Sequence, residues 1–156
     1  QEKKVPVCPK AEFMLFATDR AQHFHELIIP ALAENKMVIS DRMSDSSLVY
    51  QGYGRGLDMN AISAVNNFVM NGITPDITVY VKVNPAVALE RIVKRGAALT
   101  SFEKEENGRF IERLVYGFDT LYKNRQDVII IDGNQSEKQV TQDAVTHLLN
   151  WIQNNQ

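Results

Sequence analysis

PDITVYVKVNPAVALERIVKRG, residues 75–96, places a strand directly in front of a helix and thereby indicates the fold class. Its first nine residues change from an alternating to an apolar pattern, which is typical of a strand that becomes buried. Asn84 and Pro85 then open a helix as its N-cap and first helical residue, and Gly96 can end it. A strand that leads into a helix in this way is typical of parallel strand–helix units.

Helix and strand patterns alternate on both sides of this stretch. The segments are a helical pattern over 10–34 interrupted near Pro30, a short apolar strand over 36–41, an amphipathic helix over 58–72, a helix over 102–123, an apolar strand over 127–132 and a helix over 136–152 that opens with a capping box. Apolar strands separated by helices predict a parallel sheet with helices on both faces. We therefore expect an α/β fold of three αβα layers, built as one domain over residues 1–156.

The composition excludes several classes of protein. The formal charge of −2 offers no basic field to nucleic acid, and no apolar stretch approaches the roughly 20 residues of a membrane span. The one cysteine, Cys8, excludes a disulfide within the chain and a zinc site built from cysteines. We expect a cytoplasmic protein with neither nucleic acid nor a membrane as partner.

Asp41-Arg42 ends the predicted strand over 36–41, and in parallel sheets ligands bind beyond the carboxyl ends of the strands. A guanidinium in that place can hold a phosphate through two parallel hydrogen bonds. The neighbouring carboxylate can orient the arginine or help to hold a magnesium ion. For an isolated Asp-Arg pair, a structural ion pair is the simpler interpretation.

The segment after Asp41-Arg42 favours a binding site over a structural ion pair. Ser46, Ser47, Tyr50 and Gln51 bring hydrogen-bond donors and acceptors into one loop or short helix, and the glycines at 52, 54 and 56 let a backbone approach closely. An ordinary loop would have a similar composition. Its place directly behind a strand-end arginine favours a binding loop.

Phe16 and Arg20 form a second candidate pair, because residues four apart share a helix face. Phe13 and Phe24 flank them. Aromatic stripes are usually core, but an unpaired buried arginine is costly, so the pair also fits a pocket in which the ring stacks on a base and the guanidinium donates to it. An arginine at the rim of the core is the alternative.

Arg91 and Arg95 end the helix that begins at Asn84. Cations are favoured at a helix C-terminus whatever the function. They could also neutralise a phosphoryl group during its transfer.

Taken in order, these motifs resemble the thymidylate kinase family over essentially the whole chain. The motifs are FATDRAQH (16–23), DR (41–42), DSSLVYQGYGRGL (45–57), the strand–helix unit opened by TPD (74–76), RIVKRG (91–96) and IDGNQS (131–136). The resemblance implies a P-loop kinase fold, a magnesium-dependent transfer of the γ-phosphoryl group of ATP to dTMP in dTTP biosynthesis, and a homodimer.

The resemblance also implies roles for single residues. Phe16 would stack on thymine, Arg20 would hydrogen-bond the base, and Arg42 would bind the dTMP phosphate with Asp41 as its carboxylate partner and possible magnesium contact. Ser46, Ser47, Tyr50 and Gln51 would line the acceptor pocket, with Tyr50 near the sugar. Asp41, Arg42 and Arg95 would be catalytic. On the ATP side we expect Arg91, Arg95 and Asn134, the last from a loop near adenine.

The sequence departs from the family in places. The P-loop motif G-x-x-x-x-G-K-[ST] occurs nowhere in it, and we expect that motif and its strand to lie upstream of residue 1. Met43, Lys82 and Thr100-Ser101 replace residues common in the family. Without the P-loop segment we expect little turnover. A kinase of another nucleoside monophosphate and a non-catalytic dTMP-binding protein are the alternatives.

Overall fold

The computed structural model describes residues 7–95 and 108–155, which belong to two compact units. The N-terminal unit is Gln1–Thr74 and the C-terminal unit is Pro75–Gln156. The predicted helix end at Gly96 and the first part of the predicted helix over 102–123 lie outside the described residues.

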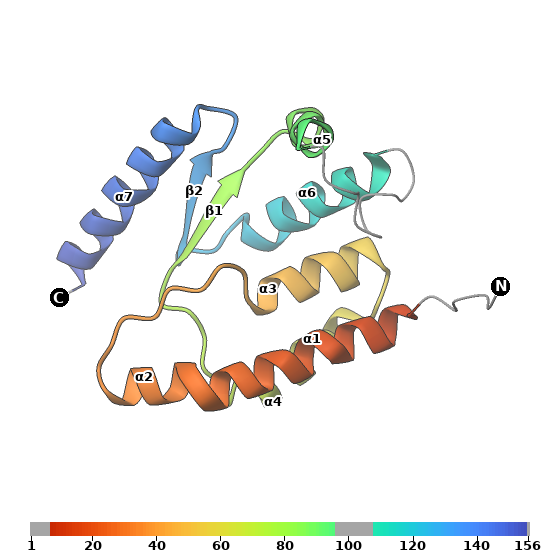
Figure 1. The fold of residues 1–156 in the computed structure, drawn as a ribbon, viewed down its shortest axis with the longest axis vertical. Coiled ribbons are helices and arrows are strands. Elements are labelled where there is room, and N and C mark those ends of the chain that lie inside the picture. The colour runs from red at the N-terminus through yellow and green to blue at the C-terminus, as the bar shows by residue number, and fades with distance from the viewer. Residues whose placement is uncertain (1–6, 96–107, 156) are drawn as a thin grey trace. The chain divides into compact units, whose positions relative to one another are not determined.

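The N-terminal unit is helical. Its elements are α1 (Pro9–His23), η1 (Phe24–Ile28), α2 (Ile29–Ala33), α3 (Ser44–Ser47), η2 (Leu48–Gly54) and α4 (Met59–Val69), and η1 and η2 are π-helical (Figure 1). The helical pattern predicted over 10–34 is therefore confirmed. Its interruption is the wider η1 turn just before Pro30, whose ring lacks an N–H and would crowd the carbonyl four residues earlier in a regular helix.

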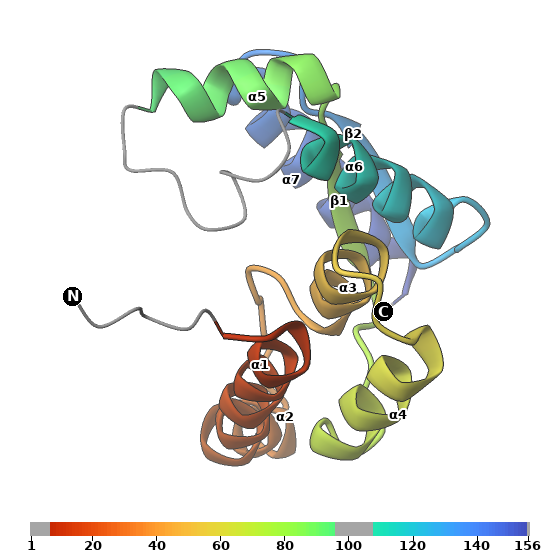
Figure 2. The same cartoon turned by 90° about the vertical axis from the view of Figure 1, so that its right-hand side faces the viewer.

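Helices α1 and α4 pack through apolar side chains spaced four residues apart. Phe13 and Ala17 of α1 meet Ile62 of α4 in one buried cluster, and Phe24 and Ile28 meet Met70 in another. Figure 2 shows α4 beside the α1–α2 run. Asp58 caps α4 as predicted, because its Oδ1 accepts a hydrogen bond from the Ala61 N–H at 2.7 Å.

The strand predicted over 36–41 is wrong. Residues 36–40 have no strand structure, and in the part of the chain that the structure describes only β1 and β2 pair. A strand needs a hydrogen-bonded neighbour, and an apolar sequence alone cannot supply one. The side chain of Ile39 is accordingly 82% exposed, and the segment is a connection that leads to Asp41-Arg42.

The C-terminal unit contains the predicted parallel strands. Its elements are β1 (Thr78–Lys82), α5 (Pro85–Lys94), α6 (Arg109–Tyr122), β2 (Val128–Asp132) and α7 (Glu137–Asn154) (Figure 1). Strands β1 and β2 pair in parallel from Thr78 opposite Val128 to Lys82 opposite Asp132. The mixed α/β class is thus confirmed, while a three-layer arrangement stays a prediction.

The predicted caps of the C-terminal unit are also present. Asn84 accepts from the Ala86 N–H at 3.0 Å to cap α5, and Ser136 accepts from the Gln139 N–H at 3.3 Å to cap α7. The ring of Tyr80 on β1 packs against those of Phe118 and Tyr122 on α6. Because β1 and β2 are parallel, the segments that follow them meet at one edge of the sheet.

None of the helices in the described ranges has both the length and the apolar character that crossing a membrane requires.

Candidate functional site

Two side chains hold the guanidinium of Arg20 in the N-terminal unit. Its Nη1 donates to Asn66 Oδ1 at 2.7 Å, and its Nη2 donates to Ser47 Oγ at 2.9 Å. Burial lowers the pKa of Arg20 below its ordinary value, while nearby Asp19 acts in the opposite direction. An arginine remains protonated near neutral pH, so a cation is held here by two neutral oxygen atoms. The guanidinium has five N–H donors, and a ligand oxygen can use the others.

Phe16 lies one helical turn before Arg20, on the same face of α1. Its side chain is 46% exposed, whereas those of Phe13 and Phe24 are 4% and 3% exposed. The aromatic stripe therefore divides into two core residues and one exposed ring. An exposed ring beside a half-buried guanidinium is an arrangement on which a flat, oxygen-bearing group can stack and accept hydrogen bonds.

Arg42 and Tyr50 form the second contact of the site. The Arg42 Nη2 donates to Tyr50 Oη at 3.1 Å, and its Cζ lies 5.0 Å from the centroid of the tyrosine ring. Arg42 has a φ of +65°, and Ser40 Oγ donates to its carbonyl at 2.9 Å. A left-handed conformation is unfavourable for a residue with a Cβ, and such strain is often found at binding sites. Asp41 and Arg42 are both exposed.

Gln51 and Ser46 are placed differently from these residues. The Gln51 side chain is 2% exposed, and its Nε2 donates to Glu12 Oε1 at 3.0 Å. Glu12 also pairs with Arg55, with 3.5 Å between Oε2 and Nη2. Ser46 is half-buried in α3. In this structure Gln51 ties η2 to α1, and its role in lining a pocket stays a prediction.

Two residues of this region were missed by reasoning from the sequence. Asn66 lies four residues after Ile62 and four before Met70, so it occupies a core position on α4, and that spacing could have revealed it. Glu12 lies four residues before Phe16 and so continues the Phe16–Arg20 face.

The predicted ATP-side residues belong to the C-terminal unit. Arg91 donates from Nη1 to the Gly133 carbonyl at 2.7 Å and from Nη2 to the Gln135 carbonyl at 3.4 Å. Asn134 accepts from the Asn84 N–H at 2.9 Å and donates to Asp132 Oδ1 at 2.7 Å. Arg91 and Asn134 thus fix loop 132–135 at the carboxyl ends of β1 and β2, and Arg95 is exposed after α5.

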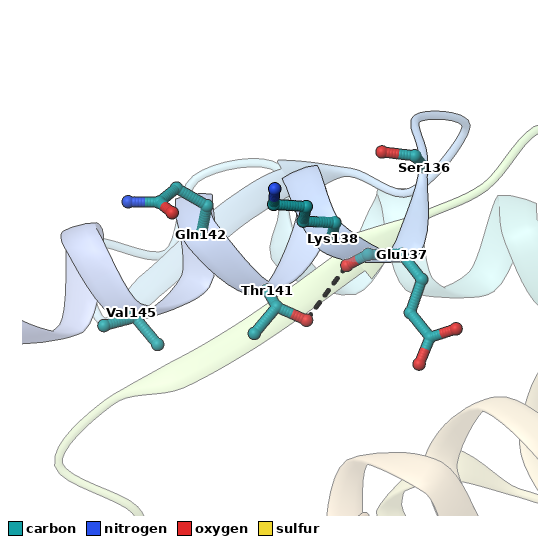
Figure 3. Close-up of a pocket in the computed structure, with 6 residues that line it drawn as sticks. All are labelled: Ser136, Glu137, Lys138, Thr141, Gln142 and Val145. Atoms are coloured by element: carbon teal, nitrogen blue, oxygen red, sulfur yellow. Dashed lines mark hydrogen bonds between the residues drawn. The ribbon is translucent and has the colours of Figure 1, made fainter.

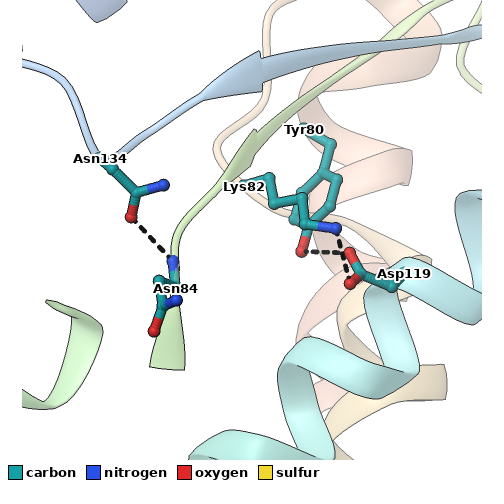
Figure 4. A network of polar contacts seen from close by, with 5 residues as sticks. All are labelled: Tyr80, Lys82, Asn84, Asp119 and Asn134. Carbon is teal, nitrogen blue, oxygen red and sulfur yellow. Dashed lines mark hydrogen bonds and ion pairs between the residues drawn. The ribbon is translucent and has the colours of Figure 1, made fainter. Parts of the chain in front are cut away.

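Figure 4 shows the contact of Asn134 with Asn84 and, separately, a polar cluster between β1 and α6. Asp119 pairs with Lys82 Nζ at 2.8 Å and accepts from Tyr80 Oη at 3.3 Å. Burial, followed by the effect of Asp119, raises the pKa of Tyr80. The unusual Lys82 is therefore neutralised inside its own unit.

A hollow of about 680 Å³ lies along α7, lined by Ser136, Glu137, Lys138, Thr141, Gln142 and Val145 (Figure 3). It contains no residue that the sequence predicted for the site. Thr141 Oγ1 already donates to the Glu137 carbonyl at 2.9 Å. The hollow is a feature of one helix surface, and the contacts of Arg20 and Arg42 define the candidate site.

Comparison with known proteins identifies the family of the chain. A family model described as thymidylate kinase matches residues 1–144. The thymidylate kinase of Staphylococcus epidermidis (strain RP62A) is 34% identical over 144 residues, which are 92% of this chain and 70% of that protein. The thymidylate kinase of Staphylococcus haemolyticus (strain JCSC1435) is 33% identical over the same shares. The chain belongs to the thymidylate kinase family.

Proposed function

We propose that this protein transfers the γ-phosphoryl group of ATP to dTMP, giving dTDP and ADP, as a step of dTTP biosynthesis. The observation that carries the proposal is the pair of contacts that hold Arg20 to Asn66 and Ser47, one helical turn after the exposed Phe16. Membership of the thymidylate kinase family supports it, and so does the P-loop kinase fold which that membership implies.

Thymine would stack on Phe16 and accept hydrogen bonds from Arg20. The base has carbonyl oxygens and a flat ring, which match the donors and the exposed aromatic face. Ser47 is 3% exposed, and its Oγ accepts from Arg20, so its part in base recognition would be to hold the guanidinium in place. These groups would select a pyrimidine with a 4-carbonyl.

The dTMP phosphate would bind Arg42. A guanidinium can hold a phosphate by two parallel bonds, and Tyr50 already supports this one from its ring and its hydroxyl. Asp41 would orient the arginine, and Tyr50 would lie near the sugar, where it favours deoxyribose. In phosphoryl transfer the protein acts mostly by positioning the reactants and stabilising charge, so these residues hold the acceptor oxygen in place for attack.

On the donor side, Arg91 would act through loop 132–135, whose carbonyls it binds, and Asn134 would lie near adenine. Arg95 would help to neutralise the transferred group. The sequence lacks the P-loop motif, so no residue of this chain is assigned to cradle the ATP phosphates.

Among the residues predicted for the site, one carboxylate could bind a magnesium ion. The described residues bring together no group of three or more His, Cys, Asp and Glu side chains. Mg²⁺ commonly takes one or two carboxylates, with waters and substrate phosphates as its other ligands. Asp41 is an exposed carboxylate and would be the protein contact of such an ion. When bound, the ion would neutralise charge on the phosphoryl group.

Two further parts of the proposal concern assembly and location. We propose a homodimer that uses the long helical run, since Met14, Leu15 and Leu27 on it are more than half exposed at 51%, 65% and 59%. We also propose a cytoplasmic location, where nucleotide substrates are present.

The test separates binding from transfer. Calorimetric titration of the chain with dTMP, dUMP, dGMP and thymidine should give the tightest binding for dTMP, and incubation of the complete gene product with dTMP, ATP and Mg²⁺ should yield dTDP and ADP. Tightest binding and transfer with another monophosphate would favour the kinase of that nucleotide. Binding of dTMP without any transfer by the complete gene product would favour a non-catalytic dTMP-binding protein. Absence of dTMP binding would overturn the proposal.

A further inference from the structure

We propose that Asn66 is a positioning residue that joins the base-binding and phosphate-binding parts of the dTMP site. This inference rests on the proposed function. Asn66 is 4% exposed, so it acts through its neighbours and does not touch the nucleotide.

The two ends of the Asn66 amide hold two different segments. Its Oδ1 accepts from Arg20 Nη1 at 2.7 Å, and its Nδ2 donates to the Ser44 carbonyl at 3.2 Å. Arg20 is the residue proposed to bind the base. Ser44 is the first residue of α3 and lies two residues after Arg42, which is proposed to bind the phosphate. One planar group therefore links both parts.

The position on α4 would otherwise suit an apolar side chain. Ile62 and Met70, one turn to either side, are 1% and 3% exposed and belong to the two core clusters. Burying an amide in such a stripe is unfavourable unless it is hydrogen-bonded, and asparagine is a poor helix former. The bonds to Arg20 and Ser44 thus account for an amide at this position.

The link to Ser44 affects the strained part of the site. Arg42 has a φ of +65°, and the turn after it is held by the Ser46 N–H, which donates to the Met43 carbonyl at 3.1 Å, and by the bond from Asn66 to Ser44. A left-handed arginine keeps that conformation only if the surrounding contacts enforce it. Loss of the Ser44 bond should therefore loosen the phosphate arginine.

The variant Asn66→Asp separates the two bonds. A carboxylate still accepts from Arg20, but it has no N–H for the Ser44 carbonyl. We expect thymidine affinity within about 3-fold of the wild type and dTMP affinity weakened about 10-fold, the size of effect that one hydrogen bond has. Asn66→Ala removes both bonds, and we expect both affinities to fall. Asn67, its exposed neighbour, supplies the matched controls Asn67→Asp and Asn67→Ala.

The experiment measures the Kd of dTMP and of thymidine for these five proteins by calorimetry. A merely structural asparagine would reduce the amount of folded protein without changing the ratio of the two affinities. An unchanged ratio in Asn66→Asp, or an equal change in Asn67→Asp, would overturn the inference alone. A wild-type protein that bound neither ligand would overturn the proposed function and the inference with it.

A measurement on the wild type covers variants that do not fold. With asparagine labelled by ¹⁵N, the Asn66 side-chain amide protons should be protected from exchange and should shift when dTMP is added. The exposed Asn67 amide should do neither. An Asn66 amide that exchanged as fast as that of Asn67, or that did not shift with dTMP, would overturn the inference.

Discussion

The two units use their cationic side chains differently. In the N-terminal unit Arg20 is held by an amide and a hydroxyl, and Arg42 by a phenol and its ring. In the C-terminal unit, the partners of Lys82 and Arg125 are the carboxylates of Asp119 and Asp127. Each unit also has exceptions. Arg55 and Lys36 of the N-terminal unit pair with Glu12 and Glu34. Arg91 of the C-terminal unit is held by backbone carbonyls.

This difference distinguishes cations that can bind a ligand from cations that stabilise the fold. A cation whose partners are neutral keeps its charge available for an anionic ligand, whereas one paired with a carboxylate is largely neutralised. Among the described residues, neither Arg20 nor Arg42 has an ion pair with a carboxylate, and both belong to the predicted acceptor site. We therefore expect deletion of Arg20 or Arg42 to reduce ligand affinity, and deletion of Lys82 or Arg125 to reduce stability.

The largest effect should come from Arg42→Ala. Two charge-assisted bonds to the dTMP phosphate would be lost, so we expect affinity for dTMP to fall at least about 100-fold while the midpoint of thermal unfolding changes little, since Arg42 is exposed. Calorimetric titration measures the affinity for dTMP, and a melting curve measures the midpoint of thermal unfolding.

Arg91→Ala is the matched control, because it deletes an arginine that binds backbone carbonyls. It should lower stability while the affinity for dTMP is retained. Unchanged dTMP affinity in Arg42→Ala would remove the arginine from the site.

Gly133→Ala tests whether tight packing of loop 132–135 stabilises the C-terminal unit. A Cβ at this position would lie 2.6 Å from Val83 Cγ2, 2.7 Å from Val81 Cγ1 and 3.0 Å from the Lys82 carbonyl. Branched side chains and backbone cannot move aside cheaply, so we expect a loss of about 1–3 kcal/mol in the free energy of unfolding. Urea denaturation followed by circular dichroism measures it.

The control for this variant is Gly56→Ala in the N-terminal unit. An added Cβ meets nothing within 4 Å there, but the φ of +74° should cost about 1 kcal/mol. A Gly133→Ala protein as stable as the wild type would mean that loop 132–135 is not closed by these contacts.

Tyr50→Phe should have a smaller effect on the binding side. The variant keeps the ring beneath the Arg42 guanidinium and removes only the hydroxyl that accepts from Nη2. We expect dTMP to bind about 3-fold more weakly and discrimination against the ribonucleotide to relax mildly, since one exposed hydrogen bond is lost. Competition between dTMP and its ribose analogue measures the discrimination. If the discrimination were unaltered, Tyr50 would have no part in sugar selection.

The sequence predicted the C-terminal unit better than the N-terminal unit. Caps such as Asn84 and Ser136 act within a few residues, and an apolar run such as 127–132 needs only the partner strand that the structure supplies. The strand over 36–41 failed because a strand depends on a neighbour, which the apolar pattern of one segment does not reveal.

The candidate site was predicted in its residue types but not in its contacts. The spacing of Phe16 and Arg20 placed both on one face, and the structure adds that only Phe16 is exposed among the neighbouring phenylalanines. Asn66 was missed, although its spacing from Ile62 and Met70 indicates a core position. Its partners lie 46 and 22 positions away, and no local pattern identifies them.

The smallest effect concerns the partly buried pair of Arg125 and Asp127. The hydrogen bond from Arg125 is the main cause that holds the pKa of Asp127 below its ordinary value of 3.8, and burial acts in the opposite direction. A carboxyl group with a lowered pKa in the folded state adds stability above its unfolded pKa, and that stability is lost as the pH falls through the folded value. Asp127→Asn should therefore be about 0.5 kcal/mol less stable than the wild type at pH 7, a typical size for a solvent-accessible pair, and nearly equal to it at about pH 2. Urea titrations at the two pH values measure this difference.

A difference that persisted in acid would mean that Asp127 stabilises the unit by contacts that do not need its charge. Because neither residue belongs to the predicted acceptor site, dTMP affinity should not change, and a change would contradict the division of roles between the two units.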